Sequence, residues 1–487
     1  MARARGARGA LAIVLHTHMP YVEGFGTWPF GEEWLWEAIV GSYAPLLELL
    51  DGGAPLTLSL TPVLCDQLEA PGVNGRFATF VEDVRRHTHE EDAAGLRAAG
   101  HEQLARELER SWTDYESALL ALERRGGDLL AALAPHAQWT SAATHAVLPL
   151  LASDDGVRLQ VDTGIASHRA RFGADTLTGA GWRGGFWLPE CAHVARMEAL
   201  LADAGVRATC VELTARHGLG AAEHLRPRLS DSGVVLVPID RASIDLVWSE
   251  RGYPAHAAYR DYHHHTIHHH TPWSNDGGAY DHAAALALAR THAADFVQRT
   301  VARLRDAGAG LPGGGLVVCA LDTELLGHWW YEGVDWLAAV VEECSRQRLE
   351  LVRLDDALER LEPAPAGEPR RQRTRARALD DRDADRPSSW GAHGDLSTWS
   401  APAVADVAFA LRRAELETVA VRPRAGRTAL RQLLALQSSD WAFMLTRELA
   451  APYARERLAL HRAALGRALL DPELLDERAT RNLGAYV

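Results

Sequence analysis

Short, continuous apolar runs recur along the chain, and several of them are followed by a stretch with helical periodicity. The runs span 11–16, 56–64, 184–189, 208–213, 234–240 and 316–322. Continuous rather than alternating hydrophobicity is typical of parallel strands that are buried on both faces. Because helical patterns such as 197–205 and 283–307 lie between these runs, the sequence predicts an α/β fold with a parallel sheet or barrel. In such folds the active site gathers at the C-terminal ends of the strands.

Three segments interrupt this alternation. The stretch 76–136 is charged and strongly helical, and we expect it to be a helical insertion in a barrel formed by 1–75 and 137–360. The stretch 361–387 is rich in proline and arginine and is predicted to be a linker or surface loop. The pattern of 388–487 is mostly helical and predicts a C-terminal helical domain.

Net charge and hydropathy restrict the class of partner. A net charge of -14 disfavours nucleic acid and anionic membranes, because both attract basic surfaces. No apolar run approaches the ~20 residues that span a bilayer. The apolar run 11–15 is too short for a signal peptide, and no small-residue cleavage site follows it. We therefore expect a cytoplasmic protein with a neutral substrate, either a monomer or a homodimer.

The reactive side chains available are also limited. The five cysteines are scattered and lack CxxC spacing, which argues against a disulfide framework and against a thiolate zinc site. All 51 basic residues are arginine. Schiff-base chemistry, pyridoxal phosphate and a P-loop are therefore excluded, because each needs a lysine amine.

Two carboxylates directly follow apolar runs. Glu190 comes after FWLP, and Asp322 ends the run LVVCALD. A parallel barrel presents its catalytic groups at this position, and two facing carboxylates are the equipment for glycoside hydrolysis. Each could instead cap a helix N-terminus, although glutamate is a poor cap. Considered together, the two residues favour a catalytic function.

Histidines close the first apolar run. His16 and His18 in HTHMPYV lie on one side, because strand side chains alternate. They could bind a metal, hydrogen-bond to sugar hydroxyls or to the carboxylates, or be satisfied structural groups. A metal-dependent hydrolase or deacetylase would use as ligands His16, His18, His145 and Asp322. The run HHHTIHHH (263–270) contains neither carboxylate nor cysteine, and we expect no physiological metal there.

Tryptophan is frequent, with 15 residues, and many lie in polar or glycine-rich surroundings. Indole faces stack on the apolar faces of sugar rings. Core filling is the default interpretation for any single tryptophan, but SSWGAHGDLSTW (388–399) carries two in a predicted loop. The tryptophans therefore favour a carbohydrate ligand.

The motifs HTHMPYV, FWLPECA, LDTELLGHWWYEG and SSDWAFML resemble the signature motifs of glycoside hydrolase family 57. VWSERGYPAHAAYRDY and SSWGAHGDLSTW resemble its 1,4-α-glucan branching enzyme subgroup, and the similarity runs from about Leu11 to beyond Phe443. The resemblance implies an incomplete (β/α)7 barrel with a helical insertion and a C-terminal α-helical domain. It also implies a retaining mechanism on α-1,4-glucan without metal or cofactor.

The resemblance further implies roles for single residues. Glu190 would be the nucleophile and Asp322 the acid/base. The donor subsite would be lined by His16, His18 and His145. The remaining substrate-binding candidates are Trp28, Trp330, Trp390, Trp399, Asp440 and Trp441.

The acceptor decides the product. A glucan 6-hydroxyl gives a branch, and water gives hydrolysis. Branching enzymes of the family typically carry a loop with a tyrosine at its tip, whereas the corresponding stretch 214–233 contains no tyrosine. An α-amylase-like hydrolase and a 4-α-glucanotransferase therefore stay open as alternatives, beside a non-catalytic glucan binder.

Overall fold

The structure is a computed structural model that describes residues 9–26, 30–173, 181–361, 363–364, 386–474 and 483. Trp28 and most of the predicted linker 361–387 lie outside the described residues.

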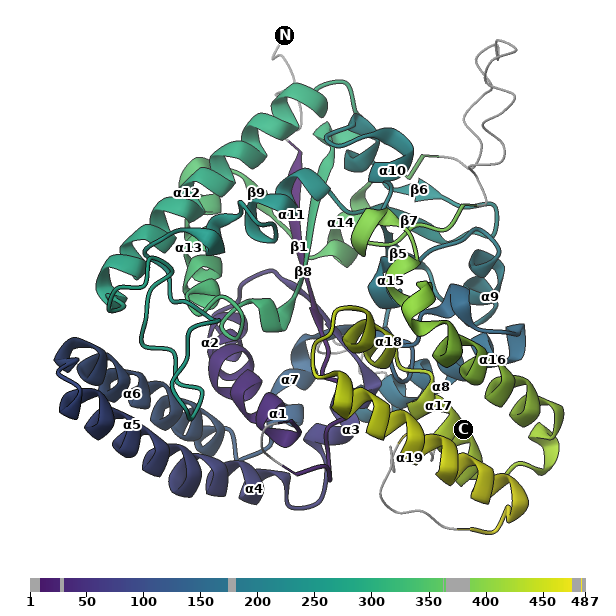
Figure 1. The fold of residues 1–487 in the computed structure, drawn as a ribbon. Coiled ribbons are helices and arrows are strands. Elements are labelled where there is room, and N and C mark those ends of the chain that lie inside the picture. Colours follow the sequence, from purple (N-terminus) through teal and green to yellow (C-terminus); the bar gives the residue numbers. More distant parts are fainter. Residues whose placement is uncertain are drawn as a thin grey trace, which may run out of the picture.

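Within the described residues, seven parallel strands follow one another around a curled sheet (Figure 1). They are β1 (Ala10–Thr17), β2 (Thr57–Leu60), β3 (Ala137–Ser141), β4 (Phe186–Trp187), β5 (Ala208–Val211), β7 (Val235–Pro238) and β8 (Leu316–Asp322). A bridge between Gly185 and Ala208 joins β4 to β5, and β8 pairs with β1. Two short strands lie at the margins: β6 (Arg228–Leu229) pairs antiparallel with β7, and β9 (Glu350–Leu351) pairs with β1.

The gap between β7 and β8 makes the barrel incomplete. Directly after β7, the N–H of Asp240 donates to the carbonyl of Val318 on β8 at 2.8 Å, and no ladder pairs the two strands within the described residues. The predicted incomplete (β/α)7 barrel is therefore confirmed.

The apolar runs form strands because the barrel buries them on both faces. Leu11 to Leu15 of β1 are all 0% exposed. The run 56–64 extends past its strand, since β2 ends at Leu60 and a helix begins at Pro62, where proline suits the first helical turn. We did not predict β3 as a strand, because its sequence AQWTS is largely polar although every residue is buried.

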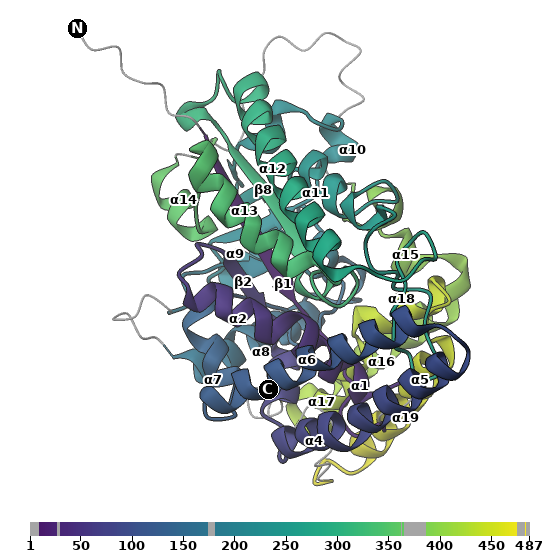
Figure 2. The same ribbon diagram turned by 90° about the vertical axis from the view of Figure 1, so that its left-hand side faces the viewer.

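Helices cover the outside of the barrel (Figures 1 and 2). They are α1 (Glu32–Ala38), α2 (Ala44–Asp51), α3 (Pro62–Leu68), α8 (Asp154–Phe172), α9 (Met197–Asp203), α10 (Thr214–His217), α11 (Arg241–Val247), α12 (His282–Ala307), α13 (Gly333–Gln347) and α14 (Leu354–Arg360). The long helix α12 lies beside α13. Within the described residues, no helix has both the length and the apolar character that crossing a membrane requires.

Between α3 and β3 the chain forms α4 (Val73–Thr79), α5 (Arg86–Ala98), α6 (Glu102–Arg124) and α7 (Leu129–Leu133), with a π-helical turn at Phe80–Arg85. Helices α5 and α6 lie side by side and project from the barrel (Figures 1 and 2). Arg260, from the segment after α11, pairs with Glu107 of α6, and both side chains are 7% exposed. This buried ion pair ties the helical hairpin to the barrel.

The C-terminal part is helical and lies against the carboxyl ends of the strands. Its helices are α15 (Ser397–Ser400), α16 (Ala405–Ala420), α17 (Arg427–Leu436), α18 (Ser439–Thr446) and α19 (Ala451–Leu470). Leu433 and Leu434 of α17 and Leu465 of α19 share a core cluster with Ala143, which follows β3, and with Leu159 of α8. This packing places the start of α18 next to the barrel residues described below.

Candidate active site

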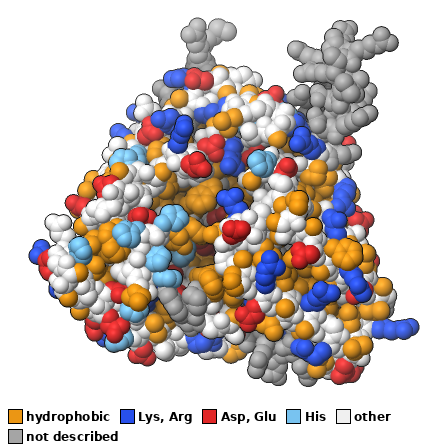
Figure 3. All heavy atoms as spheres, in the orientation of Figure 1, with side chains coloured by type: hydrophobic (Ala, Val, Ile, Leu, Met, Phe, Trp, Pro, Cys, Tyr) orange, Lys and Arg blue, Asp and Glu red, His pale blue; other side chains and the backbone are white. Residues whose placement is uncertain are grey.

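Three strand ends bring the predicted carboxylates together. His16 on β1 is in register with Asp322 on β8, so these two residues lie at the same level of the barrel. Glu190 lies three residues after the end of β4 at Trp187. Burial raises the pKa of Glu190, and the charge of Asp322 contributes to the rise. The face drawn in Figure 3 is hollowed near its centre, and histidine side chains gather along one side of the hollow.

The backbone at Glu190 is left-handed. Glu190 has a φ of 62° and Cys191 a φ of 49°, within the tight turn Pro189–Cys191. His145, in the loop after β3, also has a positive φ of 58°. Such a conformation costs of order 1–3 kcal/mol for a residue other than glycine and clusters at functional sites. The turn breaks the strand direction at Glu190, and its carbonyl accepts a hydrogen bond from the N–H of Trp390 at 3.0 Å.

Each carboxyl oxygen of Glu190 accepts one hydrogen bond. Trp390 Nε1 donates to Oε2 at 2.9 Å, and Ser439 Oγ donates to Oε1 at 3.0 Å. Burial raises the pKa of Glu190 to about 7, against the lowering effect of these two donors, and the charge of Asp322 contributes to the rise. Glu190 is therefore held by two hydrogen bonds, and its pKa lies near neutral pH.

Asp322 is exposed to solvent, yet the enclosing protein raises its pKa to about 6 through lost hydration. Among the described residues it has no side-chain hydrogen-bond partner, whereas Glu190 has two donors. A third carboxyl lies nearby: Glu324 accepts from the hydroxyl of Tyr43 at 2.6 Å and from the N–H of His18 at 3.1 Å. Burial raises the pKa of Glu324 to about 8.

The approach of Tyr43 to Glu324 depends on two glycines. A Cβ atom on Gly327 would lie 1.8 Å from the carbonyl oxygen of Gly41, so the backbones around these residues are in direct contact. Tyr43 lies in the π-helical turn Ile39–Tyr43, and Gly327 follows Asp322 in the same loop as Glu324. Tyr43 is not one of the residues predicted for the site, and no motif in the sequence indicates it.

The three predicted histidines form a stack. Ring centroids of His18 and His145 are 4.0 Å apart, those of His16 and His145 are 4.9 Å apart, and His16 lies 4.8 Å from Trp187. His16 Nε2 lies 2.9 Å from His145 Nε2, and His145 Nδ1 lies 2.9 Å from Ser439 Oγ. Burial lowers the pKa of both His16 and His145 well below the ordinary range, so both rings are neutral.

His18 behaves differently because it has an ionic partner. Its Nε2 lies 3.0 Å from Asp440 Oδ1, and its Nδ1 lies 3.2 Å from Thr61 Oγ1. Ser438 donates to the other carboxyl oxygen of Asp440. Burial alone would lower the pKa of His18, but Asp440, with smaller contributions from Glu324 and Glu190, raises it above the ordinary value.

The predicted tryptophans divide into two groups. Trp390 is half-buried beside Glu190, with its ring 5.0 Å from that of Trp187. Trp330, Trp399 and Trp441 are 1%, 3% and 0% exposed, so they have no free face for a sugar and can shape the site only from beneath. Trp399 packs against Gly391, the residue that follows Trp390: a Cβ atom on Gly391 would lie 2.7 Å from the ring of Trp399.

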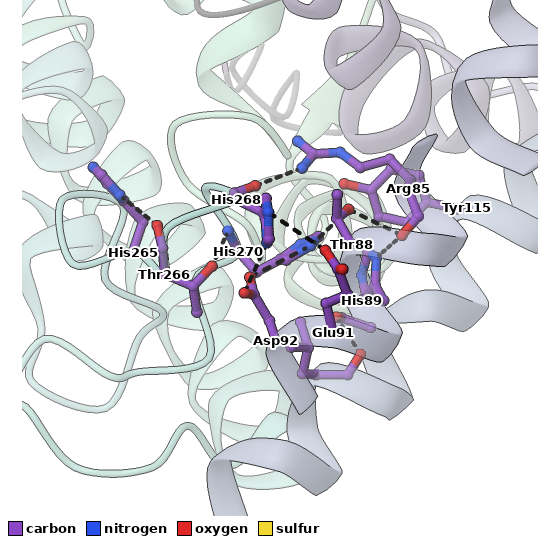
Figure 4. Close-up of polar contacts among 12 residues, drawn as sticks. Arg85, Thr88, His89, Glu91, Asp92, Tyr115, His265, Thr266, His268 and His270 are labelled. Carbon is purple, nitrogen blue, oxygen red and sulfur yellow. Dashed lines mark hydrogen bonds and ion pairs between the residues drawn. The ribbon is translucent and has the colours of Figure 1, made fainter. Parts of the chain in front are cut away.

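The histidine run 263–270 lies against α5 (Figure 4). His268 Nδ1 bonds to Asp92 Oδ1 at 2.8 Å, and His270 Nε2 bonds to Thr88 Oγ1 at 3.2 Å. The carbonyl of His268 accepts a hydrogen bond from Arg85 at 2.8 Å. The run is thus held against the helical insertion by two imidazoles and one backbone carbonyl.

In the part of the chain that the structure describes, no group of three or more His, Cys, Asp or Glu side chains is placed to hold a metal ion. The ring nitrogens of His16 and His145 face each other and two serines, instead of converging with His18 and Asp322 on one point. The ligand cluster that a metal-dependent hydrolase would need is not formed by these residues.

Comparison with known proteins places this site in a family. The family model for glycosyl hydrolase family 57 matches residues 139–366, and the model for the C-terminal part of 1,4-alpha-glucan branching enzymes matches residues 403–474.

Individual relatives match over nearly the whole chain. A 1,4-alpha-glucan branching enzyme of Thermococcus kodakarensis is 31% identical, over 93% of this chain and 72% of the relative. A probable 1,4-alpha-glucan branching enzyme of Mycobacterium tuberculosis is 32% identical, over 93% of this chain and 90% of the relative. The crystal structure of a branching enzyme of this family from Pyrococcus horikoshii superposes with a TM-score of 0.83 at 27% identity, covering 98% of this chain and 94% of that one.

Proposed function

The chain belongs to glycosyl hydrolase family 57, and on this premise we propose that it is a retaining α-1,4-glucan transglycosidase, namely a 1,4-α-glucan branching enzyme with hydrolytic side activity. The observation that carries the proposal is the carboxyl pair Glu190 and Asp322, whose pKa values are raised to about 7 and about 6. Two interacting carboxyls near neutrality share one proton at working pH, as acid/base chemistry at a glycosidic bond requires.

In the proposed mechanism, protonated Asp322 donates its proton to the glycosidic oxygen while ionised Glu190 attacks the anomeric carbon. The glycosidic bond breaks, the leaving chain departs with the proton, and a covalent glycosyl–enzyme ester forms. Asp322, now ionised, then takes the proton of the acceptor hydroxyl, whose oxygen displaces Glu190 from the anomeric carbon. The configuration at that carbon is retained after two displacements.

Burial raises the pKa of both carboxyls, to about 7 for Glu190 and to about 6 for Asp322, so a single proton is shared between them. Bound glucan favours the proton on Asp322, because a glycosidic oxygen near Asp322 accepts a hydrogen bond only from the protonated acid. Trp390 and Ser439 continue to donate to Glu190 and favour its ionised form.

The acceptor of the glycosyl group decides between branching and hydrolysis. The stretch 214–233 contains no tyrosine, and it folds as the short helix α10 (Thr214–His217), a 3₁₀ turn at Ala222–Leu225 and β6. A glycosyl–enzyme that is less shielded from water partitions further toward hydrolysis. This observation favours an α-amylase-like hydrolase as the second candidate function.

Incubation with amylose separates these outcomes. Enzymatic debranching of the product, followed by chain-length analysis, reports branches, and the release of reducing ends reports hydrolysis. We expect new α-1,6 branches together with a measurable increase in reducing ends. Reducing ends without branches would support the hydrolase, and redistributed chain lengths without either change would support a 4-α-glucanotransferase.

A further inference from the structure

A continuous series of hydrogen bonds runs through the barrel and ends on Glu190. Ser59 Oγ lies 3.3 Å from His16 Nδ1, and His16 Nε2 lies 2.9 Å from His145 Nε2. His145 Nδ1 lies 2.9 Å from Ser439 Oγ, which lies 3.0 Å from Glu190 Oε1. The four side chains before Glu190 are buried, with the most exposed residues at 3%. We call these four residues the relay.

The direction of each bond follows from the carboxylate at the end. An ionised carboxylate only accepts, so the hydroxyl of Ser439 donates to Glu190. Ser439 Oγ then accepts from Nδ1–H of His145, and a neutral imidazole carries only one N–H. His145 Nε2 is therefore an acceptor for Nε2–H of His16. His16 Nδ1 accepts in turn from the hydroxyl of Ser59.

We propose that Ser439, His145 and His16 are positioning residues for the nucleophile rather than contacts for the sugar. Both ring nitrogens of each imidazole are engaged within the relay, which leaves none to bind a sugar hydroxyl. Each donated bond polarises the next, so the relay favours ionised Glu190 and fixes the oxygen that faces away from Trp390. The inference rests on the proposed function, because it takes Glu190 to be the nucleophile.

Other charged groups also face Glu190. Asp322 on β8 and Asp440 on α18 both raise its pKa, and they therefore oppose the relay. His18 lies on the same side, and its own pKa is raised in part by Glu190. His145 Nδ1 itself lies 3.7 Å from Glu190 Oε1, and a Ser439 variant changes none of these charged groups.

The test is the pH dependence of kcat/KM with amylose for Ser439→Ala and Ser439→Thr. Loss of the hydroxyl removes a donor to the ionised form, so the acid limb of Ser439→Ala should move to higher pH by about one unit. We expect kcat to fall about tenfold with KM changed less than about twofold, and threonine to restore most of the loss. Ser111→Ala is the matched control: this buried hydroxyl donates to the carbonyl of Leu108 in α6, at 2.8 Å.

His16→Leu extends the test along the relay and replaces it where Ser439→Ala fails to fold. His16→Leu should move the acid limb in the same direction. In the double variant with Ser439→Ala it should cause little further shift, because the relay is already broken at Ser439. An unmoved acid limb in both variants, or an effect confined to KM, would overturn the inference. A Glu190→Gln enzyme that keeps turnover would instead overturn the proposed function.

Discussion

His18 Nε2 and Asp440 Oδ1 lie 3.0 Å apart although 422 residues separate them in the sequence. His18 follows β1, and Asp440 begins α18 in the C-terminal part, with side chains 11% and 12% exposed. The C-terminal helices therefore complete the carboxyl end of the barrel, because Asp440 holds His18 and Ser439 holds Glu190. Neither part of the chain forms this site alone.

We predict that Asp440→Asn lowers stability mainly at acid pH. The folded-state pKa of His18 is raised by Asp440, so protonated His18 contributes stability below its unfolded value of 6.5, and this contribution is lost as pH rises through the folded pKa. In Asp440→Asn only the smaller contributions of Glu324 and Glu190 still oppose the effect of burial on His18, so its protonation stabilises the folded state less. We expect a loss of about 1–2 kcal/mol at about pH 5.5 and a smaller one at about pH 8.5.

Thermal melting at the two pH values measures this difference. Asp306→Asn is the control, because Asp306 and its partner Arg305 are both largely exposed. An Asp440→Asn enzyme that loses equal stability at both pH values would contradict the ionic role of the pair.

We predict a bell-shaped pH profile whose limbs lie near pH 6 and pH 7, because burial raises the pKa values of Asp322 and Glu190 to about 6 and about 7. Below the acid limb both carboxyls are protonated and no nucleophile exists, and above the alkaline limb no acid exists. On a substrate whose leaving group needs no protonation, the only limb that remains is the ionisation of Glu190 beside ionised Asp322. Asp322→Asn removes the charge that raises the pKa of Glu190, so this limb should move to lower pH by about one unit.

The Asp322→Asn profile is measured with an α-maltosyl fluoride, whose leaving group needs no protonation. The wild-type enzyme on the same substrate is the reference. A limb that stays in place would mean that the two carboxyls do not interact.

We predict that Glu190→Gln abolishes turnover and leaves glucan binding intact. The amide cannot attack the anomeric carbon, and the side chain keeps its volume and its place beside Trp390, so turnover should fall by at least ~10⁴-fold. Calorimetric titration with maltoheptaose should give a dissociation constant within about threefold of wild type. Glu343→Gln, on the outer helix α13, should behave as wild type, and turnover retained by Glu190→Gln would remove the nucleophile assignment.

Much of the barrel could be predicted, because a parallel strand that is buried on both faces consists of a continuous apolar run, as in β1 and β8. The strand β3 could not, since its buried polar groups have partners far away in the sequence. Gln138 accepts the N–H of Leu58 at 2.9 Å, and Trp139 Nε1 donates to Asp355 at 2.9 Å. Hydrogen bonds to such distant partners leave no pattern in the local sequence.

At the site, Glu190 and Asp322 could be identified as candidates because each ends an apolar run. The surroundings of the tryptophans in the sequence were a weaker guide: Trp330 and Trp441 lie in polar or glycine-rich motifs and are nevertheless buried. Ser439 went unnoticed within SSDW, since a serine in a helical segment has no signal until its partner, Glu190, is placed beside it.

We predict that Asp92 fastens the histidine run, and that Asp92→Ala loosens it. Asp92 is 7% exposed and accepts from His268 Nδ1 at 2.8 Å, as Figure 4 shows. Backbone bonds inside the run, such as His269 N–H to the carbonyl of Thr266 at 3.1 Å, should then open more often. Hydrogen exchange followed by mass spectrometry should show about tenfold faster exchange in 263–270, with α5 unchanged. Asp83→Ala, an exposed position before α5, is the control, and equal exchange in both variants would show that the run is held by its other contacts.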